Sequence, residues 1–155
     1  LTPSELKALW KIGESSKRNN NERDNRRLQI GQFGIGKLAT YILARKLTYI
    51  SKKENKYILA TMDYNLIKED NKSLFIAERQ VSEEEAKTLL SYYIQNDMLS
   101  FSLFDKGAEE SWTVSLMTEL KPKAGEIKIG RLKWILSTAL PLNLGFQLEF
   151  NGALI

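Results

Sequence analysis

Three glycines within six residues, Gly31, Gly34 and Gly36, are the feature that most restricts the structure and the ligands of this chain. Glycine lets the backbone approach a ligand closely. Apolar side chains spaced three and four apart predict a helix over 37–46, directly after the glycines. The free amides and the dipole at the start of such a helix favour an anion, and phosphate is the natural guest. A turn that only lets a helix pack tightly would show the same glycines.

Two common phosphate-binding loops do not fit this segment. In a Walker A loop a Ser or Thr that binds Mg²⁺ follows the lysine, whereas Leu38 follows Lys37 here. A P-loop also follows a buried strand, and residues 25–30 contain almost no apolar run. The Rossmann fingerprint has the order G-x-G-x-x-G, while this chain has G-x-x-G-x-G. The sequence therefore favours neither site.

Several short β-rich segments follow the glycines and are separated by turns of Lys, Asn and Glu. They predict strands at 47–51, 57–61 and 73–77. Alternating apolar residues at Phe101 and Leu103, and again over 112–116, predict further half-buried strands. These short strands indicate an antiparallel meander.

Helices and a final turn complete the pattern. Residues 82–85 form a Ser-Glu-Glu-Glu capping box, and the helix that they open has its predicted buried face at Ala86, Leu89, Leu90, Tyr93 and Ile94. Further helices are predicted over 2–12 and about 130–139, and Asn151-Gly152 predicts a hairpin turn. We therefore expect an α+β fold, a two-layer sandwich with helices on one face of a mostly antiparallel sheet.

Composition restricts the chemistry. The chain has no Cys and no His, so disulfides, thiolate metal sites and imidazole bases are excluded. Its 155 residues, 43% of them hydrophobic, fit one domain over 1–155. No apolar run approaches the roughly 20 residues that span a bilayer, so we expect a cytoplasmic protein with no membrane partner. The sequence starts without Met, and we expect it to be part of something longer.

Residues 30–36 and their flanks resemble the GHKL (Bergerat-fold) ATPases, most closely the heat-shock chaperone branch and its bacterial ATP-binding relatives. The resemblance continues through Leu38-Ala39 to 47–52, and backwards through the segment 2–17. It implies the C-terminal part of a Bergerat ATP-binding domain, with 14–30 as a flexible ATP lid. Residues 14–27 contain no large apolar side chain, which independently favours a mobile segment.

The resemblance also implies a nucleotide site. Its residues would be Gly31, Gln32, Phe33, Gly34, Ile35, Gly36, Lys37, Thr113 and Lys17. The chaperones carry an aromatic where Lys37 stands, and a lysine there can reach a phosphate oxygen or lie solvated. Thr113 matches the Thr of a Gly-Thr element that holds the adenine end through water, but Trp112 replaces its glycine. A solvent-facing strand threonine is the alternative for Thr113.

The family's cofactors, ATP and Mg²⁺, imply slow ATP hydrolysis to ADP, coupled to lid closure and homodimerisation in the intact protein. In the family an Asn that holds Mg²⁺, a catalytic Glu and an Asp-x-Gly-x-Gly segment precede the lid, and none of them occurs in this sequence. We therefore assign no catalytic or metal-binding residue, and expect this segment alone to be inactive. A client protein or DNA is a further possible partner.

Two other functions compete with this interpretation. A nucleic-acid binding module would use the basic residues Lys17, Arg18, Arg23, Arg26 and Arg27. Against it, Trp10, Trp112 and Trp134 have core spacings and are not interleaved with those charges. A regulatory or dimerisation domain of the same fold, without nucleotide, is favoured by Trp112 in place of glycine.

Overall fold

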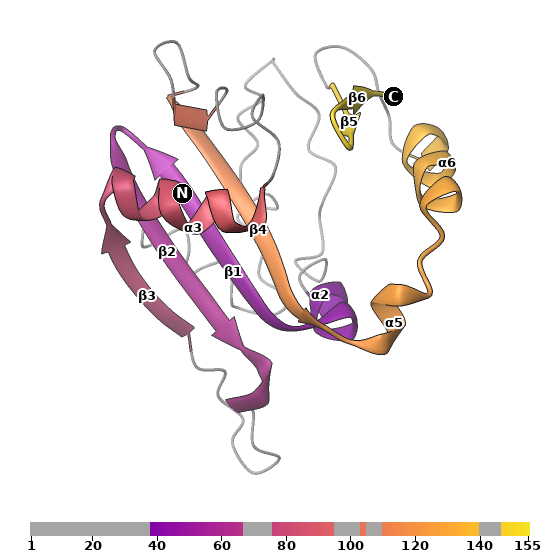
Figure 1. Ribbon diagram of the computed structural model, residues 1–155, viewed down its shortest axis with the longest axis horizontal. Helices are drawn as coiled ribbons and strands as arrows, with labels where there is room; N and C mark the ends of the chain where they lie inside the picture. The colour runs from indigo at the N-terminus through magenta and orange to yellow at the C-terminus, as the bar shows by residue number, and fades with distance from the viewer. Residues whose placement is uncertain (1–37, 67–75, 95–102, 105–109, 140–146) are drawn as a thin grey trace, which may run out of the picture.

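The computed structural model describes residues 38–66, 76–94, 103–104, 110–139 and 147–155. The elements follow one another along the chain as α2 (Leu38–Leu43), β1 (Ala44–Lys53), β2 (Lys56–Asp63), the short 3-10 helix η2 (Tyr64–Leu66), β3 (Ile76–Val81), α3 (Glu83–Tyr93), β4 (Ser111–Leu120), α5 (Pro122–Gly125), α6 (Ile129–Ala139), β5 (Glu149–Phe150) and β6 (Ala153–Leu154) (Figure 1). The predicted helix over 2–12 and the predicted lid lie outside these residues.

Four strands form one antiparallel sheet in the order β3-β2-β1-β4. The β1–β2 hairpin turns at Glu54 and Asn55, whose φ angles of 51° and 59° suit the right-handed twist of paired strands. Ile50 of β1 lies opposite Leu59 of β2 and Val114 of β4, so one face of the sheet carries a continuous apolar band. The predicted α+β class with a mostly antiparallel sheet is confirmed.

Helix α3 covers that apolar face, as Figure 1 shows. Its start is fixed by Ser82, whose hydroxyl accepts from the Glu85 amide at 3.1 Å, which confirms the predicted cap. Ala86 and Leu90 of α3 join a buried cluster with Ile50, Tyr57, Leu59 and Val81. We call this cluster the α3 core. Smaller apolar groups on the opposite face centre on Leu47 with Met62, and on Ile58 with Ala60.

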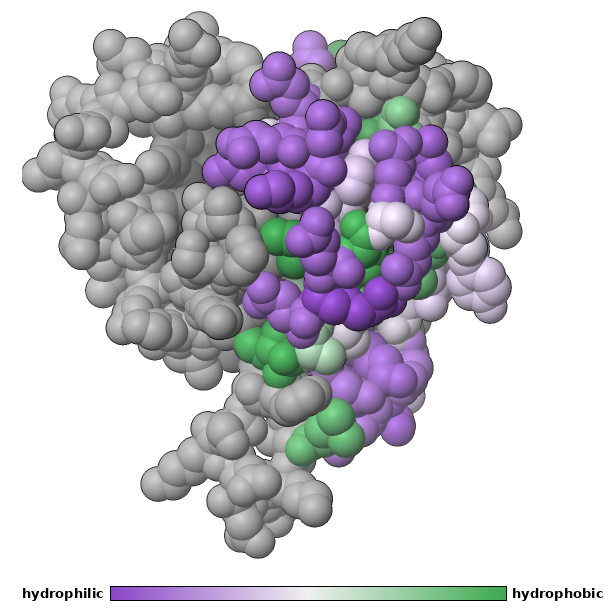
Figure 2. Space-filling model, turned by 90° about the vertical axis from the view of Figure 1, so that its left-hand side faces the viewer, coloured by the Kyte–Doolittle hydropathy of each residue, from purple (hydrophilic) through white to green (hydrophobic). Residues whose placement is uncertain are grey.

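The outer strand β3 is protected from further pairing by its side chains. Ala77, Glu78, Arg79 and Gln80 are all exposed, and the described residues on the side that carries β3 and α3 are mostly hydrophilic (Figure 2). Arg79 donates to the Glu85 carboxylate of α3. Charged side chains on an edge strand discourage contact with another sheet edge.

Several predicted boundaries of strands and helices were wrong. The helix predicted over 37–46 ends at Leu43, because Ala44 already pairs with β4, and the chain pairs with both β2 and β4 from Lys46 onward. Pairing in the sheet therefore overrides the local helical spacing. The strand predicted at 73–77 is β3, which runs to Val81; residues 73–75 lie outside the described part.

One strand prediction and two burial predictions were also wrong. Leu103 was predicted in a strand but lies in a helical turn with Phe104, where its carbonyl accepts from Trp112. Tyr93, the last residue of α3, is 47% exposed, although it lies three residues after the buried Leu90. Trp134 is 65% exposed.

The last predicted elements agree with the structure. Helix α6 differs from the predicted 130–139 by one residue. In that helix Leu132 and Leu136 are half-buried, and Trp134 lies on the other side. Asn151 and Gly152, with φ of 51° and 76°, form the hairpin turn between β5 and β6.

Candidate functional site

Thr113 is the predicted site residue that falls within the described part of the chain. It lies in β4 opposite Ser51 of β1, and the two hydroxyl oxygens are 2.9 Å apart. Thr113 is exposed, whereas Ser51 is 1% exposed. The Ser51 hydroxyl donates to the Trp112 carbonyl at 3.2 Å. This uses its one proton, so Thr113 donates to Ser51 and keeps acceptor lone pairs for a group approaching from solvent.

A second hydroxyl pair lies next to the first on the same two strands. Tyr49 of β1 is in register with Ser115 of β4, two residues from Ser51 and Thr113, so all four side chains share a face. Ser115 hydrogen-bonds the Tyr49 hydroxyl, and burial raises the pKa of Tyr49. We call Tyr49, Ser51, Thr113 and Ser115 the hydroxyl row.

The sequence analysis missed the hydroxyl row except for Thr113. A signal was present, because the strands predicted at 47–51 and 112–116 each have hydroxyl side chains two residues apart. What the sequence lacks is the register that places Ser51 beside Thr113, since pairing between distant strands depends on the whole sheet.

Trp112 points away from the hydroxyl row. Its indole nitrogen donates to the Leu103 carbonyl at 2.9 Å, and its ring meets Phe104 edge-on at 5.4 Å and Tyr57 at 6.0 Å. These contacts belong to the α3 core, on the other face of β4 from Thr113. The large Trp112 side chain therefore packs in the core, on the face of β4 opposite Thr113.

The glycine segment itself lies outside the described residues. This applies to Gly31, Gln32, Phe33, Gly34, Ile35, Gly36, Lys37 and Lys17. Helix α2 begins at Leu38, directly after the segment. The other end of α2 meets Lys121, whose amide donates to the Leu43 carbonyl at 2.8 Å and whose ammonium donates to the Tyr41 carbonyl at 2.6 Å. No sequence pattern indicated this contact.

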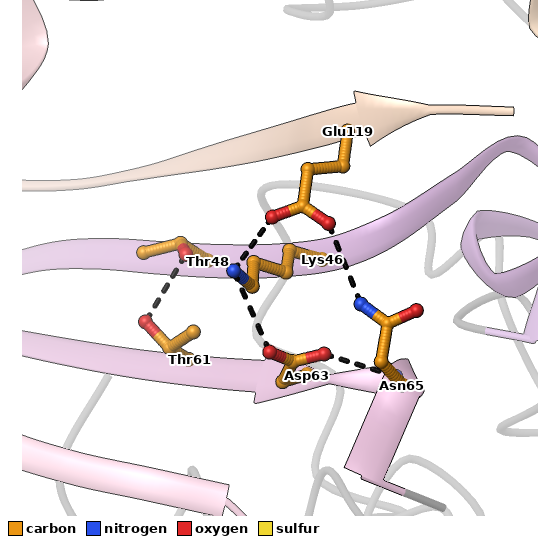
Figure 3. Close-up of polar contacts among 6 residues, drawn as sticks. All are labelled: Lys46, Thr48, Thr61, Asp63, Asn65 and Glu119. Carbon is orange, nitrogen blue, oxygen red and sulfur yellow. Dashed lines mark hydrogen bonds and ion pairs between the residues drawn. The ribbon is translucent and has the colours of Figure 1, made fainter.

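A charged cluster joins the ends of β1, β2 and β4 near α2 (Figure 3). The Lys46 ammonium lies 2.6 Å from Glu119 and 3.5 Å from Asp63. Asn65 donates to both carboxylates. Its backbone N–H donates to Asp63 at 2.9 Å, and its side-chain amide donates to Glu119 at 3.4 Å. The hydrogen bond to Glu119, with its charge, raises the pKa of Lys46. We call these four residues the Lys46 clip.

The described residues offer no ligand set for Mg²⁺. Across residues 38–66, 76–94, 103–104, 110–139 and 147–155, no group of three or more acidic side chains is placed to hold a metal. Asp63 and Glu119 are already engaged by Lys46. Among the helices in this part of the chain, none is long and apolar enough to cross a membrane.

Comparison with known proteins identifies the family of this chain. Residues 1–94 match the family described as histidine kinase-, DNA gyrase B-, and HSP90-like ATPase. No curated protein matches the chain. The matched segment contains the glycines, α2, the strands β1 to β3 and α3, and covers more than half of the 155 residues. The chain is thus a member of the histidine kinase-, DNA gyrase B- and HSP90-like ATPase family.

Proposed function

We propose that the intact protein binds Mg-ATP and hydrolyses it slowly, and that this chain supplies the phosphate-gripping half of the site. The observation that carries the proposal is the family match, which spans the glycine segment and the helix after it. Backbone amides of Phe33 to Lys37 would bind the phosphates and stabilise the charge that develops as water attacks the γ-phosphate. The products are ADP and inorganic phosphate.

At the adenine end the proposal assigns Thr113. Its exposed hydroxyl keeps acceptor capacity after bonding Ser51, so a water or an amino group can donate to it. The position of Trp112 supports this role, because the indole lies in the α3 core and cannot block a ligand on the opposite face. The nucleotide-independent interpretation loses its main argument for the same reason.

The remaining elements of the proposal come from the family. Residues 14–30, with Lys17, would act as a lid that closes over the phosphates, and Lys37 would contact a phosphate oxygen. The catalytic Glu and the Asn for Mg²⁺ would come from residues upstream of this chain. Lid closure would bring two protomers together, as in a chaperone-like ATPase with a protein or DNA client.

Calorimetric titration of Mg-ATP into two proteins tests nucleotide binding. One is this chain, and the other carries its native upstream residues. We expect the longer chain to bind, and Gly34→Val or Gly36→Val to abolish binding, because a side chain would hold the phosphates away from the backbone. The matched control is Gly130→Val in α6, where an added Cβ meets nothing within 4 Å. Unchanged affinity in both loop variants would overturn the proposal.

Nucleic-acid binding is a second candidate because of one observation. Trp134 is 65% exposed, and Lys128, Arg131 and Lys133 lie near it in sequence. An exposed aromatic among cations can stack on a base. Binding of single-stranded DNA that falls steeply with salt, is lost in Trp134→Ala and does not respond to Mg-ATP would favour this function over the first.

A further inference from the structure

Helix α2 is too short to hold its own conformation. It has six residues, and an isolated helix below about 12 residues is marginal in water. Its last carbonyls have no partner within the helix. Lys121 binds two of them, donating from its amide to Leu43 and from its ammonium to Tyr41. The Lys121 cation also lies at the negative end of the helix dipole and 3.9 Å from the centre of the Tyr41 ring.

Tyr64 holds the same helix from a second direction. Its hydroxyl lies 2.7 Å from the Thr40 hydroxyl, and its ring meets Tyr41 edge-on at 5.2 Å. Tyr64 is 9% exposed and belongs to a buried cluster with Leu47 and Met62. Helix α2 is therefore anchored to the sheet through residues from two separate segments, Tyr64 in η2 and Lys121 directly after β4.

The Lys46 clip fixes both of those segments to β1. Asp63 directly precedes Tyr64, and Glu119 lies two residues before Lys121. Glu119 has φ of 53°, a left-handed conformation that is costly for a residue with a side chain. Regular alternation would place Glu119 on the opposite face from Thr118, which pairs with Lys46. The left-handed residue instead brings its carboxylate to the Lys46 ammonium at 2.6 Å.

We propose that Lys121 and Tyr64 are positioning residues that hold α2 against the sheet and so fix the glycine segment directly before it. This inference rests on the proposed nucleotide binding. It also gives β4 two roles, since the same strand carries Thr113 and leads into Lys121.

The test compares three variants with wild type in the chain that carries its upstream residues. Lys121→Met removes the ammonium but keeps the stem, and Lys121→Arg restores a cation. Lys123→Met, in the exposed pair with Glu126, is the control with the same change in charge. We expect Lys121→Met to weaken Mg-ATP binding about tenfold and to speed amide exchange of α2 by a similar factor. Lys121→Arg should recover most of both, and Lys123→Met should match wild type.

Tyr64→Phe provides an independent check because it keeps the ring and removes only the bond to Thr40. We expect about threefold faster exchange of α2 amides and a similarly small loss of affinity. Wild-type exchange of α2 in both Lys121→Met and Tyr64→Phe would overturn the inference, whether or not wild type binds nucleotide. Faster exchange with unchanged affinity would overturn it too. Failure of wild type to bind Mg-ATP would instead contradict the proposed function.

Discussion

The two faces of β4 differ in what their side chains contact. Trp112, Val114 and Leu116 pack against the α3 core, whereas Thr113 and Ser115 are exposed and hydrogen-bond the hydroxyls of β1. Successive side chains of a strand point to opposite faces, so neighbouring residues of β4 have different surroundings. Substitutions on the first face are expected to change stability, and those on the second to change ligand binding.

Removing the centre of the α3 core should give the largest effect. Leu90 is 3% exposed and packs among the buried residues of the sheet. Leu90→Ala should lower the free energy of unfolding by about 3 kcal/mol, because it removes apolar contact and leaves a cavity. Urea denaturation measures the change. Tyr92→Ala, at a residue of the same helix that is 78% exposed, should cost less than about 0.5 kcal/mol. Equal losses would mean that α3 does not cover the sheet in solution.

Trp112→Phe should separate stability from binding on β4. It removes the bond from the indole to the Leu103 carbonyl and part of the ring contact with Phe104. We expect a loss of about 1–2 kcal/mol in unfolding free energy. Affinity for Mg-ATP in the upstream-extended chain should stay within twofold, about the scatter of a titration. A strong loss of affinity at unchanged stability would place the indole in the ligand site.

Thr113→Val, at the next residue, should show the opposite pattern. Valine keeps the shape and removes the hydroxyl that faces solvent and Ser51. We expect Mg-ATP binding to weaken about fivefold to tenfold, with a change in stability below about 1 kcal/mol. Thr113→Ser restores the hydroxyl and should bind as wild type does. If Thr113→Val binds normally, Thr113 is an ordinary exposed strand residue.

The sequence predicted the features that depend on neighbouring residues better than those that depend on distant segments. Ser82 and its helix were predicted correctly, because a cap and an apolar stripe are local signals. Residues 44–46 were wrongly assigned to a helix, and Leu103 to a strand, because contacts with distant segments decide their conformation. Thr113 was named only through the family resemblance. Ser51, Lys121 and the Lys46 clip required the register of the sheet, which no local pattern contains.

Ser82→Ala should lower stability by less than the substitutions in the core. It removes the acceptor of the Glu85 amide and leaves the start of α3 without its cap. We expect a loss of about 1 kcal/mol, and Ser82→Asp should recover it because a carboxylate caps equally well. Thermal unfolding measures both. Nucleotide affinity should not change in either variant, since α3 lies on the face away from Thr113.

The smallest effect is expected for Glu83, whose contacts make the stability of the fold depend on pH in the acid range. Lys87 at 2.7 Å, and the Tyr57 hydroxyl at 2.9 Å, lower the pKa of Glu83 from its ordinary 4.5. Because the pKa is lower in the folded state, this interaction stabilises the fold above pH 4.5 and is lost as pH falls through the folded-state value. Glu83→Gln should therefore flatten the fall in stability below that pH.

Glu84→Gln is the matched control, since it removes the same charge from the same turn of α3. The Glu83 side chain is 47% exposed, so solvent screens the pair and the difference between the two variants should be smaller than the loss in Ser82→Ala. Unfolding midpoints in urea at pH 3, 4, 5 and 7, roughly spanning the titration of a carboxyl group, measure it. Identical profiles would show that Glu83 gains nothing from Tyr57 and Lys87. The link between the start of α3 and β2 would then rest on apolar packing alone.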